Sequence, residues 1–248
     1  MTRKPSIQLY TVRDHMASRE ATLTRLAEIG YTAVEPYDPM TDPKGFRALA
    51  DDLGLTVSGT HAMAMLTEPD PDPVFEAIAT LGTDLAILPA GISEESFTTL
   101  EGLQRAADQL TDLAARASAA GLRFGYHNHW WEFEPVIDGR HALEHLADLT
   151  SPEVLFEIDT YWAAVGGADP AAVLERLGDR VVALHVKDGP IAKGEPHVAV
   201  GDGAMPIPAI LAAAPPDAWR VVELDTCETD IFEAVARSLA YLERQEAA

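Results

Sequence analysis

Two short segments, VLFEID at residues 154–159 and VVALHVKD at residues 181–188, are rich in the apolar and β-branched residues that strands prefer. Between them, residues 170–177 have the apolar period of an amphipathic helix, and Asp169 stands before the proline that opens this segment. A strand, a helix and a second strand in this order predict a parallel βαβ unit.

The same alternation runs along the whole chain and predicts eight strands and eight helices. Asp42 and Asp72 also stand directly before prolines, so we expect both of them, with Asp169, to be helix N-caps. Eight βα units in 248 residues predict an α/β protein whose residues 1–248 form a single-domain (β/α)8 TIM barrel. A doubly wound open sheet is the competing fold, but no expected strand is followed by G-x-G-x-x-G. The expected strands are residues 6–10, 32–36, 55–61, 84–90, 122–129, 154–159, 181–188 and 219–225, and the expected helices are residues 18–29, 43–53, 73–81, 94–120, 140–149, 170–177, 206–214 and 229–244.

The composition is that of a globular chain, with 47% hydrophobic residues and a strongly acidic balance. The formal net charge of −22 repels nucleic-acid phosphates, so we expect no nucleic acid as a partner. Cys227 is the only cysteine, which excludes an internal disulfide framework and a clustered thiolate zinc site. The sequence contains no apolar run near the ~18 residues that span a bilayer and no signal-peptide core, so we predict no membrane partner and a cytoplasmic location.

Polar side chains stand at the carboxyl ends of the expected strands, where TIM barrels place their catalytic groups. Alternate residues of a strand share a face, and Gly125 and Ala183 suit the crowded interior of a barrel, so we take their face as the inner one. Seven strands then bring polar side chains to this face. The inward residues are Gln8, Tyr10, Glu35, His61, His127, His129, Glu157, Asp159, His185, Lys187, Glu223 and Asp225.

A bound divalent cation would compensate the negative charge that this arrangement buries. Asp159, His185 and Glu223 stand at matching heights and form the core of the predicted metal site, with His127 as the expected fourth ligand. Imidazole and carboxylate ligands together suit Mn²⁺, Mg²⁺, Co²⁺, Fe²⁺ or Zn²⁺. The alternatives for the fourth ligand are His129, one pleat further out, and Glu132 or Glu134 in the loop beyond.

Six motifs in order along the chain are IQLYTVR, GYHNHWWEF, EIDTYWAAVGGADP, LHVKDG, VGDGA and VVELD. Together they resemble the sugar phosphate isomerase/epimerase group of the xylose isomerase-like TIM barrels, in the branch that carries Y-H-N-H. The resemblance implies a divalent metal and a small carbohydrate substrate, and it suggests a homodimer by analogy. The wider superfamily also contains inosose dehydratases, hydroxypyruvate isomerases, ketose 3-epimerases and apurinic endonucleases, so it leaves the reaction open.

Ketose epimerases of this superfamily hold their metal with glutamate, aspartate, histidine and glutamate from strands five to eight. The resemblance assigns the last three roles to Asp159, His185 and Glu223. This sequence departs at strand five, where His127 replaces the glutamate. Because the two metal-bound glutamates transfer the proton in those epimerases, we do not expect a symmetrical two-glutamate mechanism here.

Isomerisation or epimerisation next to a carbonyl removes a carbon-bound proton and leaves an enediolate, whose charge a chelated metal stabilises. The base that removes the proton is Glu223 or Glu157. Lys187 would have a lowered pKa beside a cation, which would suit it to proton transfer; its alternative role is an ion pair with Asp188 or Asp225. We therefore predict a metal-dependent isomerase or epimerase acting on a sugar, keto-sugar or cyclitol.

His129 supports a second interpretation, because it could protonate a leaving hydroxyl. The enzyme would then be a metal-dependent lyase, either a dehydratase like those acting on inososes or an enzyme that cleaves keto-glycosides. A DNA-repair nuclease on the same barrel is disfavoured by the net charge. A noncatalytic sugar-binding barrel is the remaining alternative.

The substrate contacts expected at the mouth are polar groups that meet hydroxyls and tryptophans that stack on a sugar ring. Two other patterns are set aside. HALEH spaces His141 and His145 by one helical turn but lacks the glutamate of H-E-x-x-H, and GDGAMP at residues 201–206 is either a phosphate cradle or a mobile loop over the site. The expected substrate contacts are Gln8, Tyr10, Glu35, His61, Trp130 and Trp162, with Trp131 as a further stacking surface.

Overall fold

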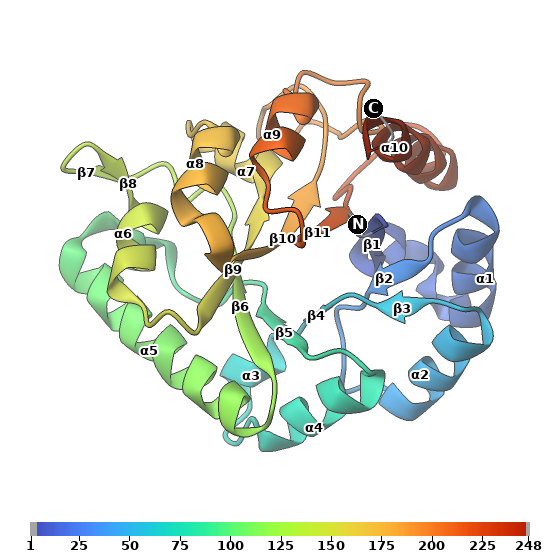
Figure 1. The fold of residues 1–248 in the computed structure, drawn as a ribbon, viewed down its shortest axis with the longest axis horizontal. Helices are drawn as coiled ribbons and strands as arrows, with labels where there is room; N and C mark the ends of the chain where they lie inside the picture. Colours follow the sequence, from blue (N-terminus) through green and yellow to red (C-terminus); the bar gives the residue numbers. More distant parts are fainter. Residues whose placement is uncertain (1–3, 247–248) are drawn as a thin grey trace.

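The structure is a computed structural model that describes residues 4–246. Its central feature is a sheet of parallel strands, in the order β3-β2-β1-β11-β10-β9-β6-β5-β4, with helices packed around it (Figure 1). A separate antiparallel hairpin consists of β7 (Val136–Ile137) and β8 (Arg140–His141). The strands of the main sheet are β1 (Ser6–Gln8), β2 (Ala33–Glu35), β3 (Thr56–Val57), β4 (Thr60–His61), β5 (Leu85–Leu88), β6 (Arg123–His127), β9 (Val154–Asp159), β10 (Val181–Val186) and β11 (Trp219–Val222).

The two ends of this sheet belong to one expected strand, residues 55–61. Its first half, β3, pairs with β2, and its second half, β4, pairs with β5. The sheet therefore closes on itself, and its nine strands occupy the eight positions of a TIM barrel. Gly59 lies at the break, where a Cβ would approach Glu35 Oε2 and Ile87 Cδ1 to 3.1 Å. The predicted (β/α)8 fold is confirmed, with the third strand divided in two.

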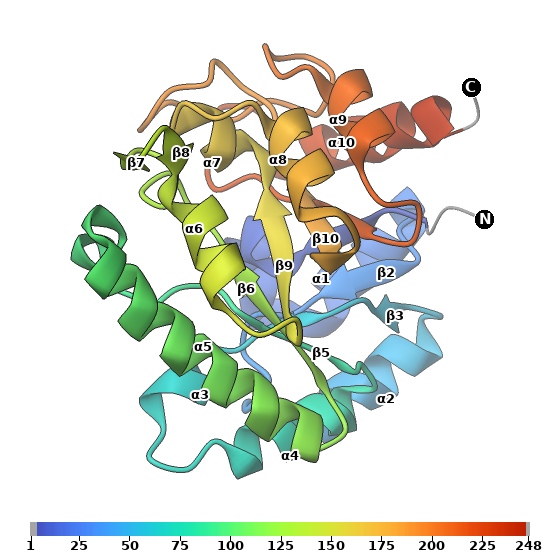
Figure 2. The ribbon, with the colours of Figure 1, turned by 60° about the vertical axis from the view of Figure 1, so that its left-hand side comes forward.

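Helices follow the strands and lie outside the barrel in both views (Figures 1 and 2). Asp42 and Asp169 cap their helices as predicted, since their carboxylates accept hydrogen bonds from the N–H groups of Gly45 and Ala171, both at 3.0 Å. The prediction for Asp72 is wrong by one position, because the helix begins at Asp72 itself. The outer helices are α1 (Arg19–Ile29), α2 (Pro43–Asp52), α4 (Asp72–Leu81), α5 (Leu100–Ala119), α6 (Ala142–Leu149), α8 (Pro170–Leu177), α9 (Ile207–Ala213) and α10 (Ile231–Glu246).

Besides the outer helices the structure has several short helical elements, and most of them lie outside the expected helices; η2 is the exception, because it forms the first part of the expected helix 94–120. The 3-10 helix η1 follows β1 without a gap, so Tyr10 lies in this helix and not at the end of an expected strand 6–10. Similarly, α7 starts directly after Asp159, the last residue of β9. These short elements are η1 (Leu9–Ser18), α3 (Ala64–Thr67), η2 (Glu94–Thr98), α7 (Thr160–Val165) and η3 (Gly178–Arg180).

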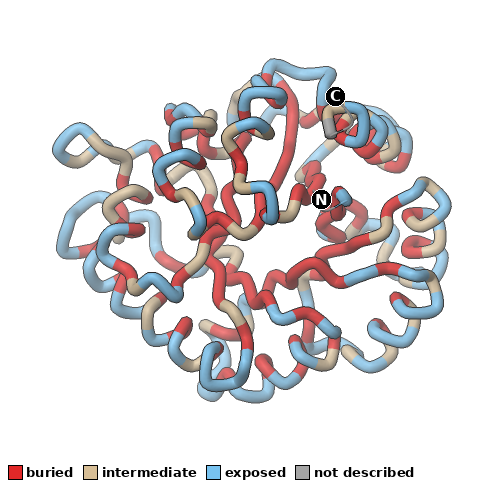
Figure 3. Tube along the Cα trace, in the orientation of Figure 1, coloured by how far each residue is buried: buried red, intermediate tan, exposed pale blue. Residues whose placement is uncertain are grey.

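Burial follows the barrel, with buried residues along the strands and exposed residues on the outer faces of the helices (Figure 3). Gly125 and Ala183 are both buried, as expected for small residues inside the cylinder. Within residues 4–246, no helix is both long and apolar enough to cross a membrane. The apolar core between the barrel and its helices holds the strand ends in place.

The expected helix 94–120 is divided at Thr99 into η2 and α5. Thr99 has an extended backbone, and its hydroxyl accepts a hydrogen bond from the N–H of Gly102 at 3.1 Å. This side chain satisfies one of the N–H groups that a helix leaves free in its first turn.

We predict that Thr99→Ala lowers the free energy of unfolding by about 1 kcal/mol, because it removes this cap. Thr99→Ser keeps the hydroxyl, so it should lower the free energy of unfolding by only a few tenths of a kcal/mol. Urea denaturation monitored by circular dichroism measures both variants. Equal stabilities for the two variants would show that the cap does not hold the start of α5.

Candidate metal centre and active site

Four side chains predicted as metal ligands meet at the carboxyl ends of neighbouring strands. His127 and Asp159 are the last residues of β6 and β9, His185 lies in β10, and Glu223 follows β11. One ligand atom from each of the four lies within 4.8 Å of the others, and all four residues are buried. The strand register sets their common height, because His185 pairs with Asp159 across β10 and β9.

A second layer of carboxylates lies beneath these four residues. Glu157 Oε2 is 3.0 Å from His127 Nδ1, and Glu35 Oε1 is 2.8 Å from His185 Nε2. Carboxylates placed on one ring nitrogen orient an imidazole and leave the other nitrogen for a metal. The nitrogens left facing the cluster are His127 Nε2, 3.9 Å from Asp159 Oδ2, and His185 Nδ1, 2.6 Å from a Glu223 oxygen.

Three of the residues assigned to substrate or to proton transfer belong to this lower layer. Glu35, Glu157 and Gln8 are fully buried and do not line the pocket described below. The Gln8 amide donates to Glu35 Oε1 at 2.8 Å, and His61 Nε2 lies 2.6 Å from Glu157 Oε2. Their geometry supports a role in holding the histidines more than a direct contact with substrate.

Lys187 lies between three carboxylates at the upper side of the cluster. Its Nζ is 2.9 Å from Asp159 Oδ2, 2.8 Å from Glu223 Oε2 and 2.9 Å from Asp225 Oδ2. Burial alone would lower the pKa of Lys187, but these three carboxylates raise it well above its ordinary value. In these surroundings Lys187 is an ammonium ion, and the lowered pKa expected for it beside a bound cation stays a prediction. The alternative ion pair with Asp225 is present, whereas Asp188 has other partners.

The residues present fit a divalent cation in chemistry and charge. Burial raises the pKa of Asp159 to about 6, and burial together with the charge of Glu157 raises the pKa of Glu35 to about 7. Both shifts show that the negative charge is incompletely compensated. Asp159 Oδ2 is buried and accepts no well-directed hydrogen bond, although the ammonium of Lys187 lies beside it. Two imidazoles and two carboxylates are a common donor set for Mn²⁺, Fe²⁺, Co²⁺ and Zn²⁺.

The alternatives for the fourth ligand lie away from the cluster. His129 lies two residues after His127 and lines the pocket. Its ring stacks on Trp131, with ring centroids 4.1 Å apart. The Glu132 carboxylate accepts hydrogen bonds from the Tyr126 hydroxyl at 2.7 Å and the His129 N–H at 2.8 Å. Glu134 is exposed and pairs with Lys193. Among the candidates on strand five and its loop, the geometry therefore favours His127.

Asn128 is a positioning residue that the sequence analysis missed. Its side-chain oxygen accepts a hydrogen bond from the N–H of Asp159 at 3.0 Å, and its NH₂ group donates to the carbonyl oxygen of Asp159 at 3.2 Å. Asn128 thus ties the end of β6 to the end of β9. The sequence signal that could have identified Asn128 is its position between the two candidate site residues His127 and His129 in the H-N-H motif.

A pocket of about 660 Å³ opens above the cluster at the mouth of the barrel. Trp130 and Trp162 line it as expected, with ring centroids 4.8 Å apart, whereas Trp131 packs behind His129 and does not reach it. The lining residues are Tyr10, Arg13, Tyr37, His61, Met63, Pro89, Ala90, His127, His129, Trp130, Trp162, Lys187, Glu223, Asp225 and Thr226.

The chain matches the model of a known protein family. A family model described as a xylose isomerase-like TIM barrel matches residues 23–244. The chain belongs to this family. Among solved structures, a sugar phosphate isomerase/epimerase from Parabacteroides distasonis ATCC 8503 is 26% identical and has a TM-score of 0.80 over 98% of this chain and 94% of that protein. The predicted resemblance is thereby confirmed.

Two curated relatives are more distant. Rhizopine catabolism protein MocC of Rhizobium meliloti is 25% identical over 190 residues, which are 68% of this chain and 57% of the relative. Inosose dehydratase of Geobacillus kaustophilus strain HTA426 is 23% identical over 205 residues, which are 71% of this chain and 63% of the relative. This chain thus spans less than two thirds of the length of either relative. The named relatives of this xylose isomerase-like barrel include an isomerase/epimerase and a dehydratase, so family membership alone does not determine the reaction.

Asp188 anchors the loop that the sequence analysis considered as a phosphate cradle. Its carboxylate accepts hydrogen bonds from the N–H groups of Gly201 at 2.9 Å, Gly203 at 3.1 Å and Met205 at 3.0 Å. These amides are therefore already satisfied and do not point at a ligand. A Cβ on Gly203 would lie 2.2 Å from Asp188 Oδ1, so the loop needs glycine at this position.

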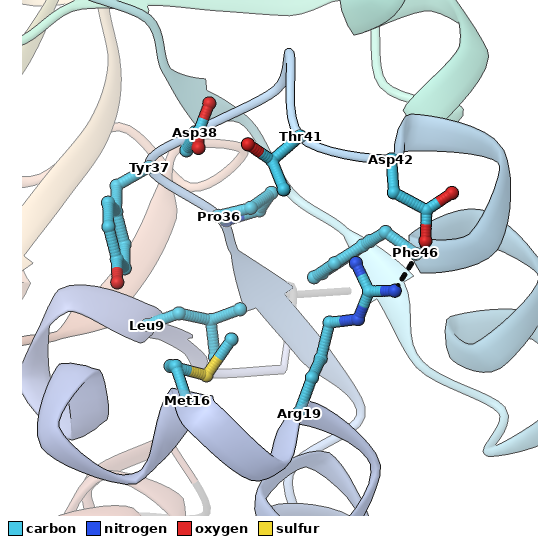
Figure 4. A pocket seen from close by; sticks show the side chains of 9 residues that line it. All are labelled: Leu9, Met16, Arg19, Pro36, Tyr37, Asp38, Thr41, Asp42 and Phe46. Atoms are coloured by element: carbon cyan, nitrogen blue, oxygen red, sulfur yellow. Dashed lines mark hydrogen bonds and ion pairs between the residues drawn. The ribbon is translucent and has the colours of Figure 1, made fainter.

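Two other features lie outside the group of four proposed metal ligands. His141 and His145 bind the backbone carbonyl oxygens of Phe133 and Ile137, so they do not form a metal pair. A second hollow, of about 460 Å³, shares Tyr37 with the site pocket (Figure 4). Arg19 reaches across it to Asp42 at 2.6 Å.

We predict that Asp188→Asn lowers the free energy of unfolding by roughly 2–3 kcal/mol, because an amide cannot accept all the hydrogen bonds that the carboxylate accepts. Backbone amide exchange at residues 201–205, measured by mass spectrometry, should accelerate in this variant. Asp202→Asn is the matched control, since Asp202 is an exposed carboxylate in the same loop. Unchanged exchange in Asp188→Asn would refute the anchoring role.

Proposed function

We propose that this protein is a divalent-metal-dependent isomerase or epimerase acting on a sugar, keto-sugar or cyclitol. The observation that carries the proposal is the convergence of His127, Asp159, His185 and Glu223, whose ligand atoms lie within 4.8 Å of one another beside the pocket. A bound metal would supply Lewis-acid stabilisation of the enediolate formed from the substrate carbonyl. The remaining chemistry belongs to the side chains of this chain.

Glu223 is the better of the two candidate bases. It lines the pocket, whereas Glu157 lies beneath the cluster and contacts histidines. Burial would raise the pKa of Glu223, but the charges of Lys187 and His185 hold it well below its ordinary value. Glu223 is therefore ionised and able to accept a proton from a carbon above it. Lys187 lies beside it, with its Nζ 2.8 Å from Glu223 Oε2, and stabilises the ionised form of this carboxylate.

His129 is the group that would protonate a leaving hydroxyl if the enzyme were a lyase. Burial, followed by the charges of His127 and Lys187, lowers the pKa of His129 to about 2, so its imidazole is neutral at physiological pH. A neutral imidazole donates a hydrogen bond to a substrate oxygen more readily than it transfers a whole proton to a leaving hydroxyl. A hydrogen bond of this kind suits isomerase or epimerase chemistry, in which no hydroxyl leaves the substrate.

A dehydratase or keto-glycoside-cleaving lyase is the second candidate function. The observation that favours it is the histidine on strand five, since His127 replaces the second glutamate of a two-glutamate epimerase. A protein with one metal-bound glutamate has one base on one face of the substrate. Removal of a proton followed by loss of a group from the neighbouring carbon requires no second glutamate. The possible homodimer and the cytoplasmic location stay predictions.

We predict that Asp159→Asn and Glu223→Gln each weaken Mn²⁺ binding at least about 100-fold, since even residues outside the ligand set change affinity 10- to 100-fold. Isothermal titration calorimetry and metal content after dialysis measure this loss, and chelation should remove activity reversibly. Asp179→Asn is the control, because Asp179 is an exposed carboxylate in η3, just before the amino end of β10, whereas the proposed ligands lie at the carboxyl ends of the strands. Stoichiometric Mn²⁺ in both site variants would refute the metal centre.

Incubation of the Mn²⁺-loaded protein with ketohexoses, 3-keto-glucosides and inososes in deuterated water separates the two candidate reactions. We expect one deuterium to enter next to the carbonyl while the number of hydroxyls stays constant, as mass spectrometry and NMR would show. Glu223→Gln should abolish this exchange, because it removes the base. Loss of water or of an aglycone from the product would establish the lyase, and absence of both changes over the panel would contradict both enzyme assignments.

A further inference from the structure

The pocket has two layers of opposite character. Its lower layer, the polar floor, consists of the titratable groups around the proposed metal centre. Its upper layer, the apolar rim, consists of side chains from the loops around the barrel mouth. The polar floor contains His61, His127, His129, Lys187, Glu223 and Asp225, and the apolar rim contains Tyr10, Tyr37, Met63, Pro89, Ala90, Trp130 and Trp162.

Two aromatic pairs form most of the apolar rim. Tyr10 and Tyr37, after β1 and β2, meet edge to face with centroids 5.4 Å apart and planes at 89°. Trp130, after β6, and Trp162, in α7, have centroids 4.8 Å apart and planes at 58°. The Trp162 ring lies 5.5 Å from Lys187 Nζ, so the apolar rim begins directly above the polar floor.

The apolar rim is larger and more exposed than one sugar ring requires. Tyr10 is 42% exposed and Met63 is 37% exposed, and large apolar side chains gathered at a pocket mouth mark a binding surface. The volume of about 660 Å³ falls in the range of pockets that hold ligands of drug size. A single sugar bound on the polar floor would leave these side chains in water.

Both cations that line the pocket already have partners within the protein. Lys187 is paired with three carboxylates. The Arg13 guanidinium donates to the carbonyl oxygens of Tyr10 and Asp225, both at 2.8 Å, and lies 4.2 Å above the Tyr10 ring. The carboxylates of Glu223 and Asp225 face the same space and would repel a phosphate.

We propose that the apolar rim is a subsite for an apolar ring carried by the sugar, so that the substrate is an unphosphorylated keto-glycoside, with its carbonyl on the sugar ring and an aromatic aglycone. This inference rests on the proposed function only in placing the reacting sugar on the polar floor. Planar rings bind well between aromatic side chains because offset and edge-to-face contacts add to the burial of apolar area. A second sugar ring fits less well, since its hydroxyls would lose hydrogen bonds to water.

Calorimetric titration of the Mn²⁺-loaded protein with matched ligands tests this subsite. The ligands are p-nitrophenyl and methyl β-D-glucopyranoside, the corresponding pair of galactosides, cellobiose and glucose 6-phosphate. We expect the aryl glycoside of at least one pair to bind at least about tenfold more tightly than its methyl partner, from burial of the aromatic ring. Cellobiose and glucose 6-phosphate should bind no more tightly than the methyl glucoside.

Met63→Ser provides the matched variant. It should weaken aryl glycoside binding about fivefold, since it removes an apolar contact, and should leave methyl glycoside binding within about twofold. Met40→Ser is the control, because Met40 is similarly exposed, at 43%, and does not line the pocket. Neither methionine belongs to the proposed catalytic machinery.

Equal affinities within both pairs, a lack of measurable aryl glycoside binding, or tighter binding of the sugar phosphate would overturn the subsite. Repeating the titration after chelation separates this result from the metal-dependent function. An aryl preference that persists without metal supports the apolar rim even if deuterium exchange fails. Exchange without an aryl preference supports the enzyme and rejects the apolar rim as an aglycone site.

Discussion

Negative charge buried at the mouth of the barrel is the constraint on which the site depends. The carboxylates of Asp159, Glu223 and Asp225 surround a single lysine, Lys187. Those of Glu35 and Glu157 lie against His185. Burial of charge without a partner is costly, so the cluster needs further positive charge from protonated imidazoles or from a cation. His185 shows the first solution: burial would lower its pKa, but Glu157 and Glu223 raise it well above the ordinary value. A divalent ion would supply the same charge from one position.

The closed barrel makes this concentration of charge tolerable. Parallel strand pairs fix His127 opposite Glu157 and His185 opposite Asp159, so each imidazole has a carboxylate neighbour at a set height. A slip of one residue would turn every one of these side chains to the other face. Backbone hydrogen bonds and the apolar layer beneath the helices resist that slip, and the polar cluster in turn depends on them.

The barrel and the meeting of the four proposed ligands could be predicted from the sequence for a simple geometric reason. Side chains alternate along a strand, and parallel strands end on one side of a sheet, so His127, Asp159, His185 and Glu223 had to share a face and a level. The depth at which other polar side chains lie below these four residues could not be predicted in this way. Glu35 contacts His185 over a separation of 150 residues, and only the folded cylinder shows that this contact draws Glu35 beneath the site.

Departures from the predicted elements have equally local causes. The third strand divides at Gly59, between a first half that pairs with β2 and a second half that pairs with β5, and a Cβ at this position would lie 3.1 Å from atoms of Glu35 and Ile87. The strand that begins at Ser6 ends early, because Gln8 accepts a hydrogen bond from the N–H of Tyr10 and starts a 3-10 helix. That turn moves Tyr10 from the inner face of a strand to the apolar rim. Short polar contacts of this kind compete with strand period and are hard to read from one sequence.

The two layers of the pocket come from different parts of the fold, and this division has a functional consequence. The polar floor is built mainly from strand ends and the residues that follow them, whose positions the sheet register fixes, whereas the apolar rim comes from loops and short helices after the strands. Substitutions in the loops can therefore alter which group the site accepts on a bound sugar, without moving the reacting centre. Substitutions in the polar floor would disturb the reacting centre itself, because its charged groups contact one another directly. His127 is the informative case. Under the proposed function it supplies the fourth ligand where the resemblance to ketose epimerases implies a glutamate, so a group that could accept a proton is replaced while the apolar rim, built from other segments, is unaltered.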